Sequence, residues 1–339
     1  MDHTKLSASD ILGCTRPEFV FGTSSKELAE PVLKALQRRW HPDRNTEPKA
    51  HEVFCYLTEL YNRLGNYLTY IHGGNTVTFK QRCETSFALG KVYHHESGVA
   101  IVLDAGRVKF GDYFVENLKK VREIVDKEER FKDKIAPFVP HLHKVSDDKR
   151  TIVVRVPKGT VNLGLLLNSQ PIPPRAAVWM VSRMLNHAVL MDYCGLVHNA
   201  FGLDSFWVNT VDHTGVDVLG YFFAVPHGEK LRSLPQESLE CYPMKALAAK
   251  VADRTVDIRL IKKAGIRLMG DLTGTGMTLK ASEDLPQSLI DWLRSPTMES
   301  KPKLDVYKEW MDDLLPKIFG ERRFYKWEIS PETVMKSEV

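Results

Sequence analysis

The sequence predicts an α+β protein in which an all-helical N-terminal domain precedes a second domain with a small sheet lobe and a larger helical lobe. Three patterns predict this order. Apolar residues recur every three or four positions up to residue 72, as on one face of a helix. β-branched and aromatic runs broken by turn residues fill 76–109, and helical patterns prevail from about Lys245 onward. The turn-forming Gly73-Gly74-Asn75 separates the two textures, so we place the domains at 1–72 and 76–330.

The composition narrows the class of protein. The 339-residue chain has 43% hydrophobic and 27% charged residues, a balance typical of globular rather than disordered proteins. No apolar run approaches the ~20 residues that span a bilayer, and the N-terminus lacks the apolar core of a signal peptide. The sequence thus predicts a cytoplasmic protein without a membrane partner. The densest charged stretch, 119–134, mixes both signs, which argues against nucleic acid as a partner. The five cysteines form no CxxC or Cys/His pair and predict reduced thiols.

Two amphipathic helices joined by a polar loop, 41–49, are predicted in the N-terminal domain. In the first helix, Leu33, Leu36 and Trp40 share one face. Pro42 ends this helix, because proline lacks a backbone donor and restricts the residue before it. The second helix begins near Ala50. Its predicted apolar stripe consists of Phe54, Leu57, Tyr61, Leu64 and Leu68, and a weaker segment at Ile11 and Leu12 is expected to pack across both helices.

The loop between these helices carries the tripeptide His41-Pro42-Asp43, and a basic face of Lys34, Arg38 and Arg39 leads into it. Arg44-Asn45 follow, and the next helix continues as Ala50-x-x-x-Phe54-x-x-x-x-Glu59-x-Tyr61. With these motifs, the first 70 residues resemble the J-domain family of DnaJ-like proteins. The resemblance implies a helical module whose tripeptide and basic helix dock on a DnaK-type chaperone and trigger its ATP hydrolysis. The segment 14–25 is longer than in the common pattern, which affects the packing of the first helix.

The chemistry of the tripeptide suits such docking. Pro42 stiffens the loop, so little conformational entropy is lost on binding. Asp43 can pair with an arginine of the partner, while the basic face steers an acidic surface towards it. Two alternatives remain open at this level. The segment can be a helix hairpin with an ordinary Pro-Asp turn, or a module that mediates assembly without a chaperone partner.

From residue 76 onward the order of elements resembles the protein-kinase fold at three places. Gly195-Leu196-Val197-His198-Asn199-Ala200 follow a long helix introduced by Pro173-Pro174, where kinases carry the His-Arg-Asp catalytic loop. Gly215-Val216-Asp217-Val218-Leu219-Gly220 come where kinases have the strand into Asp-Phe-Gly, and Val99-Ala100-Ile101-Val102 replace the Val-Ala-Ile-Lys strand. The resemblance implies a two-lobed, kinase-like domain in which Asp257 lies on the helix that anchors the catalytic loop.

Phosphoryl transfer needs a base, metal-holding oxygens and a lysine on the phosphates. The resemblance implies that these groups are missing, although His198 is retained. The base position is Ala200, and the metal-holding positions are Ser205 and Gly220. The lysine position is Val102, or Asp104 if the strand is shifted by two residues, and only Gly90 remains of the glycine-rich loop. We therefore predict a pseudokinase without cofactor or metal. The preferred hypothesis is a co-chaperone of a DnaK-type chaperone, whose pseudokinase domain holds an unknown protein client or partner.

An active enzyme is the alternative function. An atypical protein kinase or nucleotide-dependent transferase could use Asp204 and Asp217 for the metal and Lys91 in place of the lysine. A turn residue, a strand-edge residue and a solvated lysine explain the same positions more simply. The remaining candidates, His94-His95 and His141-x-His143, lack a third ligand at a suitable spacing and are interpreted as surface or loop histidines.

Overall fold

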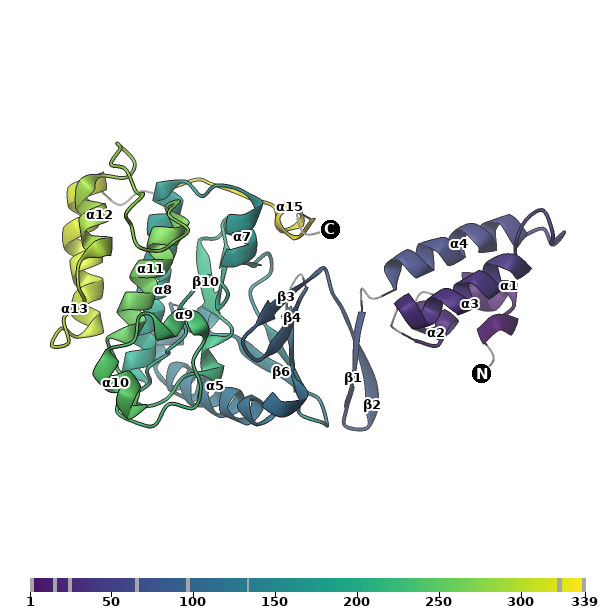
Figure 1. Ribbon diagram of the computed structural model, residues 1–339, viewed down its shortest axis with the longest axis horizontal. Helices are drawn as coiled ribbons and strands as arrows, with labels where there is room; N and C mark the ends of the chain where they lie inside the picture. The colour runs from purple at the N-terminus through teal and green to yellow at the C-terminus, as the bar shows by residue number, and fades with distance from the viewer. Residues whose placement is uncertain are drawn as a thin grey trace. The chain divides into compact units, whose positions relative to one another are not determined.

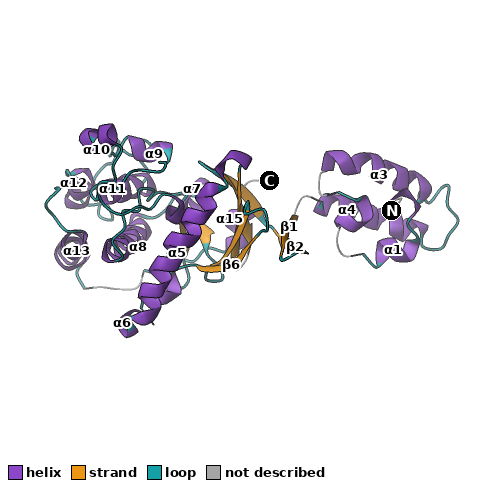
Figure 2. Ribbon diagram, turned by 90° about the horizontal axis from the view of Figure 1, so that it is seen from below, coloured by secondary structure: helices purple, strands orange, loops and turns teal. Residues whose placement is uncertain are grey.

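The computed structural model describes residues 3–14, 17–23, 26–64, 67–95, 98–132, 134–321 and 325–336. The chain forms two compact units, Met1–Cys83 and Glu84–Val339, and each is described by itself. Both helices and sheets are present (Figures 1 and 2), so the predicted α+β class is confirmed. Within the described ranges, no helix combines the length and the apolar character needed to span a membrane.

The first unit is built on a pair of helices with shorter helices packed around it. Its helices are η1 (His3–Lys5), α1 (Ala8–Leu12), α2 (Pro17–Phe21), α3 (Lys26–Arg39) and α4 (Ala50–Arg63). Ser7 begins α1 in a capping box with Asp10, in which each side chain accepts from the other residue's backbone N–H. The helices α3 and α4 pack side by side and are joined by residues 40–49 (Figure 1), as predicted.

One apolar cluster holds the first unit together. The predicted face of Leu33, Leu36 and Trp40 is buried, and Ile11 of α1 packs in the same cluster. In α4, however, the predicted stripe is only partly correct. Tyr61 lies at the edge of the cluster, where its ring contacts Phe21, and Phe54 is half-buried against the ring of His41. The buried positions of α4 and the residue after it are Ala50, Val53, Leu57, Leu60 and Leu64.

The tripeptide Gly73-Gly74-Asn75, at which the sequence placed the domain boundary, belongs to a β-hairpin. It lies at the turn between β1 (Tyr67–His72) and β2 (Asn75–Lys80), which pair antiparallel from Tyr67–Lys80 to His72–Asn75. Gly73 and Gly74 have φ of +57° and +74°, which suits a two-residue hairpin turn. Leu68, predicted as the end of the helical stripe, lies in β1 because α4 ends at Arg63. The first unit therefore extends through the hairpin to Cys83.

The second unit starts with a five-stranded sheet in the order β3-β4-β5-β7-β6. The strands are β3 (Cys83–Phe87), β4 (Gly90–His95), β5 (Gly98–Leu103), β6 (His141–Val145) and β7 (Thr151–Arg155). Helix α5 (Lys109–Lys127) shares a core with the sheet, in which Phe114, Leu118 and Val121 join Val99 and Ile101. Three short helices flank α5: η2 (Ala105–Arg107), α6 (Glu129–Lys132) and η3 (Ala136–Phe138).

Residues 156–160, here called the connector, lead from this sheet into the helical part. A small sheet with the order β10-β9-β8 follows, made of β8 (Val161–Asn162), β9 (Phe206–Asn209) and β10 (Thr214–Asp217). Helix α8 (Pro174–Tyr193) is largely buried and packs against α11 (Val256–Leu268) and α13 (Lys303–Lys308). The remaining elements are α7 (Leu163–Ser169), η4 (Gly220–Phe222), α9 (Gln236–Leu239), α10 (Met244–Ala249), α12 (Gln287–Arg294), the π-helical η5 (Glu309–Leu314), α14 (Leu315–Phe319) and α15 (Pro331–Lys336).

Candidate functional site

The tripeptide His41-Pro42-Asp43 lies in the loop that joins α3 to α4. The side chain of Asp43 is 86% exposed, and Pro42 is exposed as well. His41 is less exposed, because its ring packs edge-on against Phe54 of α4 with the ring centroids 5.4 Å apart. The carboxylate is therefore open to a partner, while the imidazole is held by packing.

Hydrogen bonds fix the shape of this loop. The carbonyl oxygen of His41 accepts from the backbone N–H groups of Arg44 and Asn45, each at 2.9 Å. The N–H of Asp43 donates to Nδ1 of His41 at 3.2 Å, so a neutral ring carries its proton on Nε2. Asn45 Nδ2 donates to the carbonyl of Arg39 at 3.1 Å and so satisfies an acceptor left open at the end of α3. The loop is thus ordered without a partner.

The predicted basic face divides in the structure. Lys34 and Arg38 lie one turn apart on α3 and are exposed, and Lys34 pairs with Glu30 at 2.6 Å. Arg39 lies on another side of the helix, where its Nη1 donates to the carbonyl of Thr4 at 3.2 Å. Lys34 and Arg38 therefore share one exposed surface of α3, while Arg39 is engaged with the N-terminal segment.

In the second unit, a buried carboxylate anchors the loop that follows α8. Asp257 of α11 is fully buried. Its Oδ2 accepts from the N–H of His198 at 3.0 Å, and its Oδ1 accepts from the N–H of Asn199 at 2.9 Å. The ammonium of Lys303, itself 2% exposed, lies 2.6 Å from Oδ2 and neutralises the carboxylate. The anchoring role predicted for Asp257 is therefore confirmed.

Asn199 completes the anchoring, and sequence reasoning did not single it out. Its φ is +65°, a left-handed conformation that asparagine tolerates better than most residues. Its Nδ2 donates to the carbonyls of Val197 and Phe223, and its Oδ1 accepts from the hydroxyl of Tyr242 at 2.9 Å. The loop conformation is thus fixed by contacts to residues more than 20 positions away.

The structure places the three positions at which the sequence predicts lost catalytic residues, Ala200, Ser205 and Gly220, in buried surroundings. Ala200 is buried and ends in a methyl group. Ser205 uses its hydroxyl inside the loop, accepting from the N–H of Gly202 at 3.1 Å and donating to its carbonyl at 3.3 Å. A Cβ on Gly220 would lie 1.8 Å from Nε2 of His198. No carboxylate side chain fits at Gly220 while the His198 ring keeps its place.

At Val102, where the resemblance implied a lysine, the neighbouring strand supplies one. Lys91 of β4 is paired directly with Val102 of β5, so their side chains lie on one face of the sheet. The Lys91 ammonium lies 2.5 Å from the carboxylate of Glu84, and this contact raises the pKa of Lys91. A lysine is thus present on the strand next to β5, where the resemblance implied a lysine at Val102.

Three buried titratable side chains meet beside the loop. Nε2 of His198 lies 2.9 Å from Oδ1 of Asp217, and Nε2 of His187 lies 3.9 Å from Oδ2. Burial lowers the pKa of His187 to about 4, so this ring is neutral at pH 7. The N–H of Ala200 donates to Nδ1 of His198 at 3.2 Å. Nε2 of both histidines and Oδ2 of Asp217 are buried without a hydrogen-bond partner among the described residues, and the three side chains lie close enough together to hold one metal ion.

The two carboxylates of the enzyme alternative face different neighbours. Asp217 is fully buried, points at His198 and accepts from the N–H of Gly220 at 3.2 Å. Asp204 belongs to the loop before β9 and lies beside the first turn of α7. Its Oδ1 is 3.0 Å from the point that a Cβ on Gly164 would occupy. Sequence reasoning missed His187, because its spacing on α8 among Met184, Ala188 and Met191 is that of an ordinary core position.

The predictions about surface histidines have two outcomes. His141 and His143 of β6 are exposed, as predicted. His94 is only 2% exposed, so its interpretation as a surface histidine is wrong. It lies on the buried face of β4, where its Nε2 is 2.8 Å from the hydroxyl of Thr85 and its Nδ1 accepts from Nε1 of Trp207 at 3.3 Å. Burial lowers the pKa of His94 to about 4.

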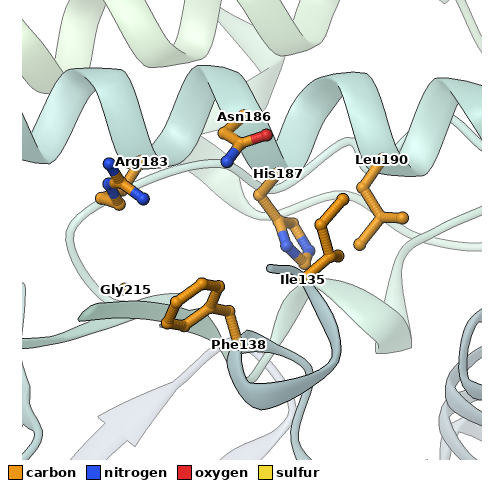
Figure 3. Close-up of a pocket in the computed structure, with 7 residues that line it drawn as sticks. All are labelled: Ile135, Phe138, Arg183, Asn186, His187, Leu190 and Gly215. Atoms are coloured by element: carbon orange, nitrogen blue, oxygen red, sulfur yellow. The ribbon is translucent and has the colours of Figure 1, made fainter. Parts of the chain in front are cut away.

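A hollow opens beside His187 (Figure 3) and measures about 310 Å³ when its open mouth is counted. Arg183, Asn186 and His187 of α8 supply its polar lining. Only about 20 Å³ of this space can hold the centre of a water molecule, which is room for about one water, so the hollow is too small to enclose a small-molecule ligand. Its other lining residues are Ile135, Phe138, Leu190 and Gly215.

No family model and no curated protein matches this chain. Among solved structures, the chain is similar to the kinase domain of Mycobacterium tuberculosis PknI, crystallised as a double mutant. The match has a TM-score of 0.45 and 13% sequence identity, and it covers 74% of this chain and 95% of that kinase domain.

Proposed function

We propose that the first unit is a J-domain that docks on a DnaK-type chaperone in the cytoplasm and stimulates its ATP hydrolysis. The observation that carries the proposal is the ordered loop that presents the Asp43 carboxylate 86% exposed, directly after the helix that carries the exposed Lys34 and Arg38. A pre-ordered loop loses little entropy on binding, and the two cations favour an acidic partner surface. The chaperone performs the chemistry, and this chain triggers it.

Asp43→Asn is expected to weaken stimulation of DnaK ATP hydrolysis at least about tenfold, because losing one partner of a charge pair costs about 2–5 kcal/mol in binding. His41→Gln is expected to weaken it as well, because it removes the ring that packs against Phe54 and the Nδ1 that accepts from Asp43, both of which hold the shape of the loop. Steady-state ATP hydrolysis by DnaK, titrated with the full chain, measures this effect. Glu47→Gln, an exposed acid in the same loop, is the matched control and should stimulate normally. Equal stimulation by all four proteins contradicts the proposal, provided that circular dichroism shows them equally folded.

For the second unit we propose a kinase-like fold that serves as a scaffold for a protein client. Its five-stranded sheet with one packed helix, followed by a helical part with an anchored loop after α8, supports the fold. The residues at Ala200, Ser205 and Gly220 support a pseudokinase, because Ala200 and Gly220 have no side-chain oxygen and the Ser205 hydroxyl is already hydrogen-bonded to the backbone of Gly202.

One observation favours a second candidate function, a nucleotide-dependent transferase. Lys91 shares a sheet face with Val102 and can supply the cation that the Val102 position lacks. If so, Mg²⁺-ATP should raise the melting temperature of the full chain, and Lys91→Ala should remove this shift. Lys149→Ala is the matched control, because Lys149 is also exposed and paired with an acid, Asp112, at 3.0 Å. No shift with the wild-type chain, together with no transfer from radiolabelled ATP, eliminates the enzyme.

A further inference from the structure

The last described segment of the chain, residues 325–336, here called the strap, packs along the second unit like a bound peptide. Residues 325–330 are extended, and their burial alternates: Tyr325, Trp327 and Ile329 are half-buried, whereas the residues between them are exposed. Helix α15 follows and buries Val334 completely. Alternating burial means that one face of an extended chain lies on a surface and the other faces solvent.

The strap contacts three separate parts of the unit. The backbone of Tyr325 hydrogen-bonds to the imidazole of His213, and the N–H of Ile329 donates to the hydroxyl of Thr210 at 3.0 Å. Pro331 lies beside the connector, 3.9 Å from the point that a Cβ on Gly159 would occupy. Helix α15 then packs against α7 and β8, and the ribbon shows the strap passing over α7 (Figure 1).

The strap is attached to the unit without the backbone ladder that holds a strand in a sheet. In the described part of the unit, the small sheet is complete as β10-β9-β8, and the strap pairs with none of its strands. The bond at Ile329 is made to a side chain rather than to a backbone ladder. Because no ladder of backbone hydrogen bonds joins it to a described strand, the strap can leave this surface without breaking a sheet.

We propose that residues 325–336 are a releasable strap, bound in a groove of the second unit formed by the 209–214 turn, the connector, α7 and β8. The groove binds an extended peptide with apolar side chains at alternate positions followed by a short helix, and the strap is its occupant within the same chain. Because the strap crosses from the 209–214 turn to the connector, its binding also restrains the joint between the sheet and the helical part. This inference goes beyond the proposed functions of both units.

The test uses the full chain with Val334→Asp, which places a charge at a fully buried position, and Thr333→Asp, its exposed neighbour, as the matched control. A fluorescent peptide of residues 325–336 should bind the Val334→Asp chain at least about tenfold more tightly than the wild type or Thr333→Asp, because burying a valine is worth roughly ten- to a hundredfold in an equilibrium constant. Binding no tighter to Val334→Asp than to the wild type overturns the proposal.

Hydrogen exchange provides a second measurement on the same proteins. Amides of the connector and of the 209–214 turn should exchange faster in Val334→Asp than in the wild type. In Thr333→Asp they should exchange at the wild-type rate. Equal exchange in the three proteins overturns the restraint on the connector. If Val334→Asp does not fold, Val334→Ala replaces it, and Val334→Ala should again bind the peptide more tightly and exchange faster than the wild type and Thr333→Asp. If the wild type is a dimer and Val334→Asp makes it a monomer, the strap binds the groove of a second chain, and its assignment to the groove of its own chain is wrong.

Discussion

Replacing Asp257 with asparagine is expected to lower the free energy of unfolding of the second unit by about 3–5 kcal/mol, because removing one member of a buried ion pair leaves the other charge uncompensated. Lys303 would remain buried at 2% exposure without its carboxylate. The asparagine amide could also accept from only one of the two N–H groups, of His198 or Asn199, that Asp257 now satisfies. Urea unfolding followed by tryptophan fluorescence measures the change.

A double substitution separates the charge from the loop anchoring. Asp257→Asn combined with Lys303→Met removes both charges and should be less destabilised than the sum of the two single variants, since the two residues interact directly. Asp305→Asn is the matched control, an exposed acid two residues from Lys303, and should change the free energy of unfolding by less than about 0.5 kcal/mol. If Asp257→Asn costs no more than Asp305→Asn, the buried carboxylate does not anchor the loop.

Acidification is expected to destabilise the second unit between pH 6.5 and about 4, with His94 contributing about 3 kcal/mol. Burial lowers the pKa of His94 from 6.5 to about 4, so in this window the unfolded chain binds a proton that the folded chain does not. The free energy of unfolding therefore falls as the pH falls. The structure adds a reason for the lowered pKa, because a proton on Nδ1 of His94 would point at the N–H of Trp207, which now donates to that nitrogen.

His94→Gln is the informative variant for this pH dependence. A glutamine amide can accept from Trp207 and donate to Thr85 without titrating, so the slope of stability against pH should become shallower. Some slope should remain, because burial lowers the pKa of His187 to about 4 as well. His227→Gln, at an exposed position, should leave the slope unchanged. An identical slope in the wild type and His94→Gln would show that His94 does not titrate in this window.

Local sequence patterns predicted the elements well where the signal lies within one element. Pro42 and the spacing of Leu33, Leu36 and Trp40 placed the helix pair and its loop correctly. The pattern at Pro173-Pro174 placed the start of α8. The stripe of α4 was less accurate, because aromatic residues at its edge satisfy a helical period as well as core residues do. Val53 and Leu60 fill the core instead of Phe54 and Tyr61.

The sequence by itself determined the helix pair and the place of the tripeptide in the loop between the two helices, because these depend on residue identity and on spacings of a few residues. Tertiary structure alone decided that His94 is buried against Trp207, that His187 and His198 meet at Asp217, and that the strap reaches Thr210. The first and last of these contacts join residues 113 and 119 positions apart. Periodicity reports which face of an element is apolar, and it carries no information about which distant residue packs against that face.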